Sequence, residues 1–399
     1  MIPEPVVVVG AGAAGLATVT GLRGNGFQGR LSWIGAEATL PYDRPPLSKE
    51  VMTAARTSEQ IALCTWDKVA ELDVDLRLGT TVTGVDIDAR KIMLSDGNLL
   101  PFGCLVAATG VNPRTLPGSE HLAGMHIVRT LDDAIALRSG LGPGRRLVVI
   151  GGGFLGTELA AAARSLGTDV VLLDPGPAPL CAAVGADVGV MVADLHREHG
   201  VEIRTGPGAA VVRVDARGGT FDGVTLADGT AIAADVALVA IGSVPATSWL
   251  AETGVDCADG LRCDEFCETD VPGVYAVGDV SNWYHIGLGA RVRLEHRTNA
   301  AEQGLYVARR ILGQAAEPFA PVPYFWSDQY DLKIQAYGLL RGHDEVRVVD
   351  GAIADREFVA LYRRGDRLAG VLGVRRARAL RQWRAQVAAG VAWTDASVL

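Results

Sequence analysis

Two glycine-rich turns are the features of this chain that point most directly to chemistry. The first is Gly10-Ala11-Gly12-Ala13-Ala14-Gly15 and the second is Gly151-Gly152-Gly153-Phe154-Leu155-Gly156. Each follows a short apolar run rich in β-branched residues and precedes a stretch rich in Ala and Leu. In that strand-turn-helix context the spacing is typical of a site that binds a dinucleotide pyrophosphate at a helix N-terminus. The sequence therefore predicts two dinucleotide sites.

An acidic residue placed after each turn completes the pattern. Glu37 lies 22 residues after Gly15, and Asp174 lies 18 residues after Gly156. A carboxylate at this spacing accepts hydrogen bonds from ribose hydroxyls and repels the 2′-phosphate of NADPH. No Lys or Arg follows Asp174 as far as Val192, so the second site is predicted to prefer NADH. The alternative for Asp174 is a solvated aspartate at the end of a strand.

The cysteines do not form a redox motif. The two that lie nearest to each other, Cys263 and Cys267, fall in a segment that is predicted to be a turn before a strand. Because the chain has no C-x-x-C pair, we expect reduced, buried thiols in a cytoplasmic protein, with no metal site. The six cysteines are Cys64, Cys104, Cys181, Cys257, Cys263 and Cys267.

Composition and charge exclude some classes of partner. The 399 residues carry a net charge of −9, which argues against nucleic acid because nucleic-acid binding needs clustered basic residues. From Pro321 to Leu399 there are 12 Lys and Arg against 9 Asp and Glu, so this part has a net charge of +3 and the first 320 residues carry −12. The uncharged stretch 5–22 contains the first glycine turn, so we expect a buried strand and helix there and no targeting or membrane segment.

Strand and helix patterns alternate from Val6 onward, which predicts a doubly wound α/β fold with parallel sheets. The apolar runs 86–94 and 211–226 are each followed by an Asp-Gly turn, which predicts a β-hairpin or meander in each half. Further strand runs end in small residues at 105–110 and 238–242. These paired patterns predict an internal duplication of the chain.

These patterns suggest three domains. The first is predicted at 1–110 and 243–320, and the second is predicted as an insertion at 111–242. A linker marked by Pro318, Pro321 and Pro323 leads to the third, at 321–399. In the third domain we expect an antiparallel sheet, from runs such as 345–349 and 358–362, and then a helix at about 375–389.

Four longer motifs carry a resemblance to a known family. They are Pro41-Tyr42-Asp43-Arg44-Pro45-Pro46-Leu47-Ser48-Lys49, 151–158, 274–279 and Phe325-Trp326-Ser327-Asp328-Gln329-Tyr330. With them the chain resembles the FAD-dependent, NADH-using ferredoxin reductases of the pyridine nucleotide-disulfide oxidoreductase superfamily. The resemblance implies two Rossmann-like domains arranged as in glutathione reductase, plus a C-terminal α+β domain. It also implies FAD at the first glycine turn and NADH at the second.

The resemblance implies a function as well. Disulfide reductases of the superfamily carry a cysteine pair where this chain has 43–49, and peroxide or oxidase relatives keep a single cysteine near there. Electrons are therefore expected to pass from NADH through FAD to an iron-sulfur ferredoxin, with a [2Fe-2S] or [3Fe-4S] cluster, that serves a cytochrome P450 or other oxygenase. Two alternatives stay open. One is an NADH oxidase, and the other is an NADH-sensing flavoprotein similar to apoptosis-inducing factor.

The resemblance also assigns roles to single residues. Lys49 is expected beside flavin N5, paired with Glu158, and these two form the predicted catalytic pair. Asp279 is expected to precede a helix and to reach the ribityl hydroxyls. Arg297 replaces an aromatic residue of some relatives, so its side chain could stack on the flavin or donate to its carbonyls. Trp326 is expected near the exposed flavin edge. The alternatives are an exposed lysine for Lys49, a helix cap for Asp279 and a core tryptophan for Trp326.

The remaining predicted contacts belong to the two nucleotide sites. For Ala36 and Val82 the alternative is plain core packing. The residues are Gly10, Gly12, Ala13, Ala14, Gly15, Ala36, Glu37, Arg44, Val82, Ala108, Thr109, Gly110, Arg129, Gly151, Gly153, Phe154, Leu155, Gly156, Asp174, Gly242, Gly278, Glu295 and His296. A basic segment is predicted to dock an acidic ferredoxin, with a solvated helix face as the alternative. It contains Arg375, Arg376, Arg378, Arg381 and Arg384.

Overall fold

The computed structural model describes residues 4–119 and 121–397, so the outer ends of the first and third predicted domains lie outside it. The chain divides into two compact units. Unit 1 comprises Met1–Asp43, Glu59–Asn112 and Val244–Pro323, and unit 2 comprises Arg44–Ser58, Pro113–Ser243 and Tyr324–Leu399. Residues 44–58, which lie within the first predicted domain, thus belong to unit 2. The division into three domains stays a prediction.

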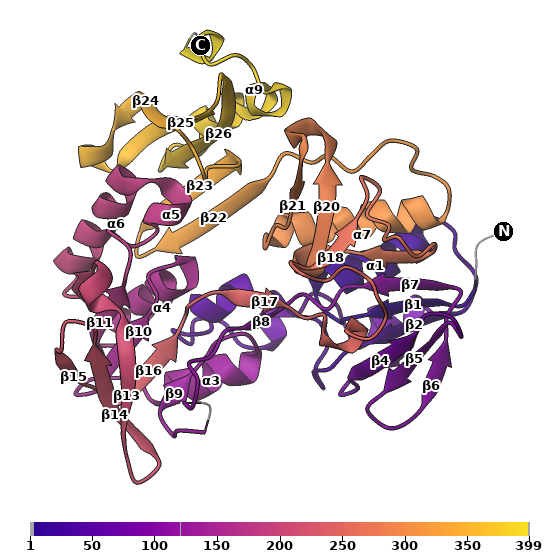
Figure 1. The fold of residues 1–399 in the computed structure, drawn as a ribbon, viewed down its shortest axis with the longest axis horizontal. Coiled ribbons are helices and arrows are strands. Elements are labelled where there is room, and N and C mark those ends of the chain that lie inside the picture. Colours follow the sequence, from indigo (N-terminus) through magenta and orange to yellow (C-terminus); the bar gives the residue numbers. More distant parts are fainter. Residues whose placement is uncertain (1–3, 120, 398–399) are drawn as a thin grey trace. The chain divides into compact units, whose positions relative to one another are not determined.

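Unit 1 is built on a five-stranded parallel sheet (Figure 1). Its strands are short apolar runs, and Val6–Val9 is buried at every residue, as expected for a sheet that is covered on both faces. Helices α1 (Ala13–Gly24) and α7 (Arg297–Ile311) pack closely on each other, since a Cβ at Gly304 would lie 2.5 Å from the Ala14 carbonyl oxygen. The strand order is β19 (Val274–Ala276), β7 (Cys104–Ala107), β1 (Val6–Val9), β2 (Leu31–Ile34) and β3 (Asp75–Arg77).

Two smaller three-stranded sheets and a short helix, α2 (Trp66–Glu71), also belong to unit 1. The first sheet is an antiparallel meander with a turn at Gly97, where φ is +85°. It confirms the hairpin predicted from the Asp-Gly turn. Its strands are β4 (Val82–Asp86), β5 (Lys91–Leu94) and β6 (Leu99–Pro101), and the other sheet contains β18 (Leu261–Cys263), β20 (Ser281–His285) and β21 (Ala290–Val292).

Unit 2 repeats this plan with a second five-stranded parallel sheet. The antiparallel strands β13 (Val211–Arg217), β14 (Thr220–Leu226) and β15 (Ala231–Ala233) confirm the second predicted hairpin. The parallel order is β12 (Glu202–Thr205), β11 (Asp169–Asp174), β10 (Arg146–Ile150), β16 (Val236–Val239) and β9 (Met125–His126). The helices are α3 (Leu131–Ser139), α4 (Phe154–Ser165), α5 (Cys181–Val184) and α6 (Ala186–Glu198).

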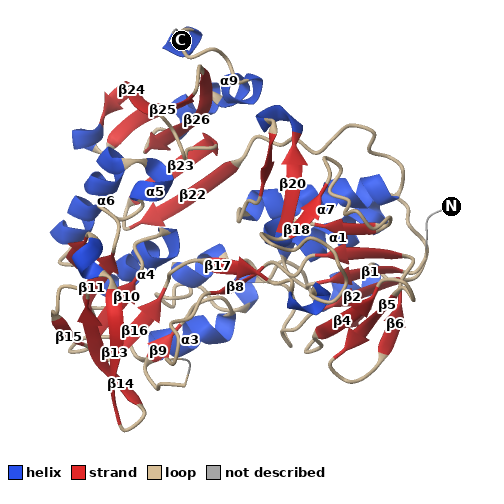
Figure 2. Ribbon diagram, viewed as in Figure 1, coloured by secondary structure: helices blue, strands red, loops and turns tan. Residues whose placement is uncertain are grey.

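The C-terminal residues form an antiparallel five-stranded sheet that shares a core with α5 and α6 (Figure 2). Leu195 of α6 packs in the same buried cluster as Phe358, and the Tyr362 hydroxyl donates to the Val184 carbonyl oxygen at 2.6 Å. The sheet therefore belongs to the same compact unit as the second glycine turn. Its strands, in order, are β22 (Tyr324–Gln329), β23 (Leu332–Gly338), β26 (Arg367–Val374), β25 (Glu357–Arg364) and β24 (Glu345–Ala352).

The single helix predicted at 375–389 is wrong. Two short helices, α8 (Ala377–Gln382) and α9 (Arg384–Ala389), meet at Trp383. The Trp383 side chain is buried, as are Leu380 of α8 and Val387 of α9. The α/β fold class, with two Rossmann-like domains and a C-terminal α+β part, is confirmed. Of the helices in the described ranges, none is both long and apolar enough to cross a membrane.

Candidate functional site

The first glycine turn connects β1 to α1 by a backbone path that only glycine allows. A Cβ at Gly10, where φ is +117°, would lie 2.2 Å from the Ala108 carbonyl oxygen, and a Cβ at Gly15 would lie 1.9 Å from the Gly10 carbonyl oxygen. Gly12 is different, because a Cβ there would meet nothing within 4 Å. Gly12 is the N-cap of α1, and within the described structure no side chain caps this helix and its first turn holds no acidic residue. The helix start, with Ala13, thus presents N–H groups and open space to an anion.

The structure places three of the predicted residues of unit 1, Ala108, Thr109 and Gly278, against this turn. Ala108 and Thr109 follow β7 and lie against Gly10. A Cβ at Gly278 would lie 3.0 Å from the Ala14 Cβ, so the end of β19 meets the start of α1. The expectation that Asp279 precedes a helix is wrong, because Asp279 lies in a 3₁₀ turn (Gly278–Val280) that leads directly into strand β20.

Glu37 lies three residues after β2 and has a defined partner. The Tyr42 hydroxyl donates to Glu37 Oε2 at 2.5 Å, and the Gly79 N–H donates to the Glu37 carbonyl oxygen at 3.0 Å. Both the side chain and the backbone of the predicted ribose ligand are therefore held. Neighbouring Ala36 is exposed, whereas Val82 is buried at the start of β4.

Arg297 is the first residue of α7 and forms an ion pair. Its Nε lies 2.5 Å from Asp43 Oδ1, so the guanidinium is directed to a carboxylate of unit 1. Glu295 accepts a hydrogen bond from Arg293 at 2.8 Å. Between them, His296 is the N-cap residue of α7, and burial lowers its pKa to about 4, which keeps the ring neutral at pH 7.

The second glycine turn repeats the geometry of the first. A Cβ at Gly156 would lie 2.0 Å from the Gly151 carbonyl oxygen, whereas a Cβ at Gly153 would meet nothing within 4 Å. Gly153 is the N-cap of α4, which among the described residues also has no side-chain cap and no acidic residue in its first turn. Asp174 accepts hydrogen bonds from Gly152 N at 2.7 Å and Gly176 N at 2.6 Å. A carboxylate fixed in this way is placed to accept ribose hydroxyls and to repel a phosphate.

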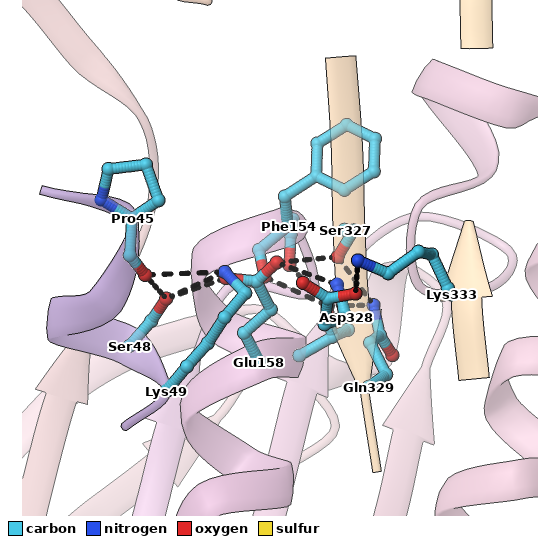
Figure 3. Close-up of polar contacts among 11 residues, drawn as sticks. Pro45, Ser48, Lys49, Phe154, Glu158, Ser327, Asp328, Gln329 and Lys333 are labelled. Atoms are coloured by element: carbon cyan, nitrogen blue, oxygen red, sulfur yellow. Dashed lines mark hydrogen bonds and ion pairs between the residues drawn. The ribbon is translucent and has the colours of Figure 1, made fainter. Parts of the chain in front are cut away.

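Lys49 and Glu158 form a buried ion pair within unit 2 (Figure 3). Lys49 Nζ lies 2.5 Å from Glu158 Oε2, and the two side chains are only 15% and 8% exposed. The Ser48 hydroxyl donates to the same oxygen at 2.6 Å, and the Ser327 hydroxyl donates to Glu158 Oε1 at 2.6 Å. Since both carboxylate oxygens accept hydrogen bonds and one of them also pairs with the ammonium, the burial of this charge is tolerated and the ammonium is held in one place.

Strand β22 divides its residues between two faces. Ser327 contacts Glu158, and Gln329 donates to the Thr157 hydroxyl at 2.8 Å. Residues that alternate with these point to the opposite face. Trp326 lies there, opposite Gln335 on β23, with its ring 6.1 Å from that of Tyr324. Trp326 is partly exposed, which distinguishes it from the core tryptophan of the alternative interpretation.

Arg44 and Arg129 are brought together in unit 2. The Arg44 guanidinium donates to the Arg129 carbonyl oxygen, and the Arg129 N–H donates to Asp133 Oδ2 at 3.0 Å. The residues predicted to contact nucleotides therefore divide between the units. Unit 1 holds Gly10–Gly15, Ala36, Glu37, Val82, Ala108–Gly110, Gly278, Asp279 and Glu295–Arg297, and unit 2 holds Arg44, Lys49, Arg129, Gly151–Glu158, Asp174, Gly242 and Trp326.

The cysteines are free thiols. Cys104 and Cys263 are buried, which raises the pKa of each to about 12, and burial also raises the pKa of Cys267. Thiols in such surroundings stay protonated and are poor nucleophiles. Within the described ranges no group of three or more His, Cys, Asp or Glu side chains could hold a metal ion.

Four residues of this site were not assigned a role from the sequence: Tyr42, Asp43, Ser48 and Ser327. Each lies inside a motif quoted for the resemblance. The sequence showed their residue types and their places within the motifs, but it did not show which side chains they contact. Ser327, for example, is 169 positions from Glu158 along the chain.

The comparisons with known proteins cover nearly the whole chain. Residues 4–304 match the family described as pyridine nucleotide-disulphide oxidoreductase, and residues 324–399 match the reductase C-terminal family. Putidaredoxin reductase from Pseudomonas putida is 35% identical over 377 residues, which are 94% of this chain and 89% of that protein. The ferredoxin–NAD(+) reductase component of the anthranilate 1,2-dioxygenase system from Burkholderia cepacia is 37% identical over 395 residues, which are 98% and 95% of the two chains.

Solved structures agree with these relatives. The chain matches putidaredoxin reductase in its covalent complex with putidaredoxin with a TM-score of 0.92, 34% identity and coverage of 97% of this chain and 93% of that one. It matches the ferredoxin reductase for the CYP199A2 system from Rhodopseudomonas palustris with a TM-score of 0.93, 31% identity and coverage of 99% and 98%. The chain therefore belongs to the pyridine nucleotide-disulphide oxidoreductase family.

Proposed function

We propose that the chain is an NADH-dependent ferredoxin reductase that passes electrons through FAD to an iron-sulfur ferredoxin of a cytochrome P450 or other oxygenase system. The observation that carries the proposal is the buried Lys49–Glu158 ion pair in a chain whose cysteines are all free thiols. Where disulfide reductases of the superfamily carry a cysteine pair, this chain has the segment that contains Lys49. Electrons that leave the flavin therefore have no internal disulfide to reduce. A cytoplasmic location is part of the proposal, and the free cysteines are consistent with a reducing compartment.

The residues present fit both nucleotides. The glycine turn of unit 1 offers open backbone at Gly12 beside the uncapped start of α1, which suits the FAD pyrophosphate, and Glu37 suits the ribose. The turn of unit 2 offers the same features at Gly153 and Asp174, which suit NADH. Bound FAD supplies the hydride acceptor and the one-electron donor that side chains lack.

The residues around Glu158 have a defined electrostatic task. Glu158 and the hydroxyl of Ser48 hold the Lys49 ammonium at one position. A cation held in place before the reaction stabilises negative charge that develops as the flavin is reduced, with little reorganisation at that moment. Ser327 orients the other carboxylate oxygen. On this view Lys49 acts on the cofactor, whereas Glu158, Ser48 and Ser327 are positioning residues.

NADH-driven reduction of purified ferredoxins tests the proposal. We expect the holoenzyme to reduce a [2Fe-2S] or [3Fe-4S] ferredoxin at least about 100 times faster than it reduces a small disulfide, because it has no disulfide to relay electrons, and also faster than it reduces oxygen. Initial rates with each acceptor at equal NADH give the comparison. Faster reduction of oxygen would support an NADH oxidase. Slow bleaching of the flavin by NADH with a persistent long-wavelength band would support an NADH sensor.

The ion pairs formed by two of the five arginines at 375–384 support a smaller docking face for the ferredoxin than the whole basic segment. Arg375 pairs with Asp331, and Arg376 lies 3.4 Å from Glu357, so these two are neutralised within unit 2. The other three arginines are exposed, and no ion pair is recorded for them within residues 4–119 and 121–397. We call them the α8–α9 arginine face: Arg378, Arg381 and Arg384. An acidic ferredoxin is the partner whose charge complements this face.

Replacing all three residues of the arginine face by Gln is expected to lower kcat/KM for ferredoxin about tenfold at low ionic strength and to flatten its dependence on salt. The rate of flavin reduction by NADH is expected to stay unchanged. Stopped-flow and steady-state rates over a series of salt concentrations measure both. A control with the same change of charge replaces Arg145, Arg213 and Arg217 elsewhere in unit 2. An equal decrease of kcat/KM for ferredoxin in the two triple variants would contradict docking at this face.

A further inference from the structure

Residues 41–43 form a fixed segment in unit 1. Tyr42 makes an antiparallel bridge with Ala62, the Asp43 N–H donates to the Ile61 carbonyl oxygen at 2.8 Å, and the Leu63 N–H donates to the Pro41 carbonyl oxygen at 2.8 Å. The Tyr42 side chain is buried. The segment is therefore anchored on both sides of Tyr42, immediately before the chain leaves unit 1 at Arg44.

The side chains of the two neighbours Tyr42 and Asp43 reach different elements. The Tyr42 hydroxyl donates to Glu37 Oε2 at 2.5 Å, beyond the end of β2, and Asp43 Oδ1 lies 2.5 Å from Arg297 Nε at the start of α7. Successive side chains of an extended segment point in opposite directions, which explains how adjacent residues serve separate partners. Both partners are residues that were assigned to the flavin nucleotide from the sequence.

The Asp43–Arg297 ion pair also has a local reason. A cation at the first position of a helix is opposed by the positive end of the helix dipole. The Asp43 carboxylate offsets that repulsion and ties the start of α7 to the segment. Tyr42 is thereby held through both of its neighbours, since Pro41 bonds Leu63 and Asp43 bonds Ile61 and Arg297.

We propose that Tyr42 is a positioning residue for FAD. The Tyr42 hydroxyl holds the Glu37 carboxylate in the orientation that accepts the ribose hydroxyls of FAD. The inference rests on the proposed function, which assigns Glu37 to the ribose of FAD. An ionised carboxylate accepts several hydrogen bonds, so the bond from Tyr42 leaves acceptor sites for a ligand. Without that bond the Glu37 side chain is held less firmly, and FAD must order it to a greater extent on binding.

Release of FAD from the holoenzyme tests this role without NADH or ferredoxin. We expect Tyr42→Phe to release FAD about tenfold faster, followed as the rise of free-flavin fluorescence after dilution, because a charge-assisted hydrogen bond is lost. Glu37→Gln is expected to do at least the same. The double variant is expected to match Glu37→Gln alone, because Tyr42 acts through Glu37.

A matched control removes a tyrosine hydroxyl elsewhere in unit 1. The Tyr306 hydroxyl donates to the Glu317 carbonyl oxygen at 2.8 Å, and Tyr306→Phe is expected to leave the rate of FAD release unchanged. An unchanged rate in Tyr42→Phe, or effects of Tyr42→Phe and Glu37→Gln that simply multiply, would overturn the inference. A chain that holds FAD as expected but reduces no ferredoxin contradicts only the proposed function, whereas a chain that binds no FAD overturns both.

Discussion

Replacing Lys49 by Met is expected to slow NADH-driven flavin reduction about 100-fold, measured by anaerobic rapid mixing. Met has an unbranched side chain one atom shorter than that of Lys, so the substitution keeps most of the volume and removes the ammonium that lies 2.5 Å from Glu158 Oε2. Loss of one fixed group that stabilises developing charge typically costs a factor of about 100 to 1000. Glu158→Gln is expected to have a smaller effect of about tenfold, because the ammonium remains but is held less firmly.

The Lys49→Met variant is also expected to have a lower free energy of unfolding than the unsubstituted protein. Lys49→Met leaves a carboxylate that is only 8% exposed without its counter-ion, and breaking a buried pair in this way costs about 3 kcal/mol. Thermal unfolding of the holoenzyme measures the loss. Lys333→Met is the matched control, since Lys333 lies 3.1 Å from Asp328 in the same unit but is 55% exposed, and such surface pairs contribute little. If the two variants reduce flavin at equal rates, Lys49 has no electrostatic role.

Replacing Gly156 and Gly153 of the second turn by Ala is expected to have different effects, on the stability of the fold in one case and on NADH binding in the other. Gly156→Ala places a Cβ 2.0 Å from the Gly151 carbonyl oxygen, so strand β10 and helix α4 must separate. We expect a loss of about 4 kcal/mol or more and little folded protein. Gly153→Ala meets nothing within 4 Å, so the fold is expected to survive. The methyl group occupies the space where the pyrophosphate approaches, and KM for NADH is expected to rise at least about tenfold.

The first turn provides the control for this assignment. Gly12 and Gly15 repeat the open and closed geometry of Gly153 and Gly156. Gly12→Ala is expected to fold and to lose FAD during purification, whereas Gly153→Ala is expected to keep FAD and to bind NADH weakly. Absorbance of bound flavin and NADH titrations separate the two. Loss of FAD in Gly153→Ala with normal FAD in Gly12→Ala would reverse the roles of the two turns.

Local patterns were sufficient for the strands and turns. The two glycine turns lie between a strand and a helix as predicted, and both Asp-Gly hairpins are present. These features depend on residues close in the chain, whose backbone preferences and alternation act without the rest of the fold. The helical pattern at 375–389 indicated the helical segment but not its interruption at Trp383, where α8 ends and α9 begins. The helix expected after Asp279 failed because the chain there joins a strand.

The sequence by itself determined that this protein has two dinucleotide turns, each with its acidic residue, and no cysteine pair, because those properties depend on residue type and short spacing. Only the tertiary structure decided which groups meet. Lys49 and Glu158 are 109 positions apart, Asp43 and Arg297 are 254 apart, and Ser327 of strand β22 reaches Glu158 of helix α4 over 169 positions. Contacts between residues so far apart in the chain depend on how whole sheets and helices pack against each other. The spacing of residues along the sequence carries no information about that packing.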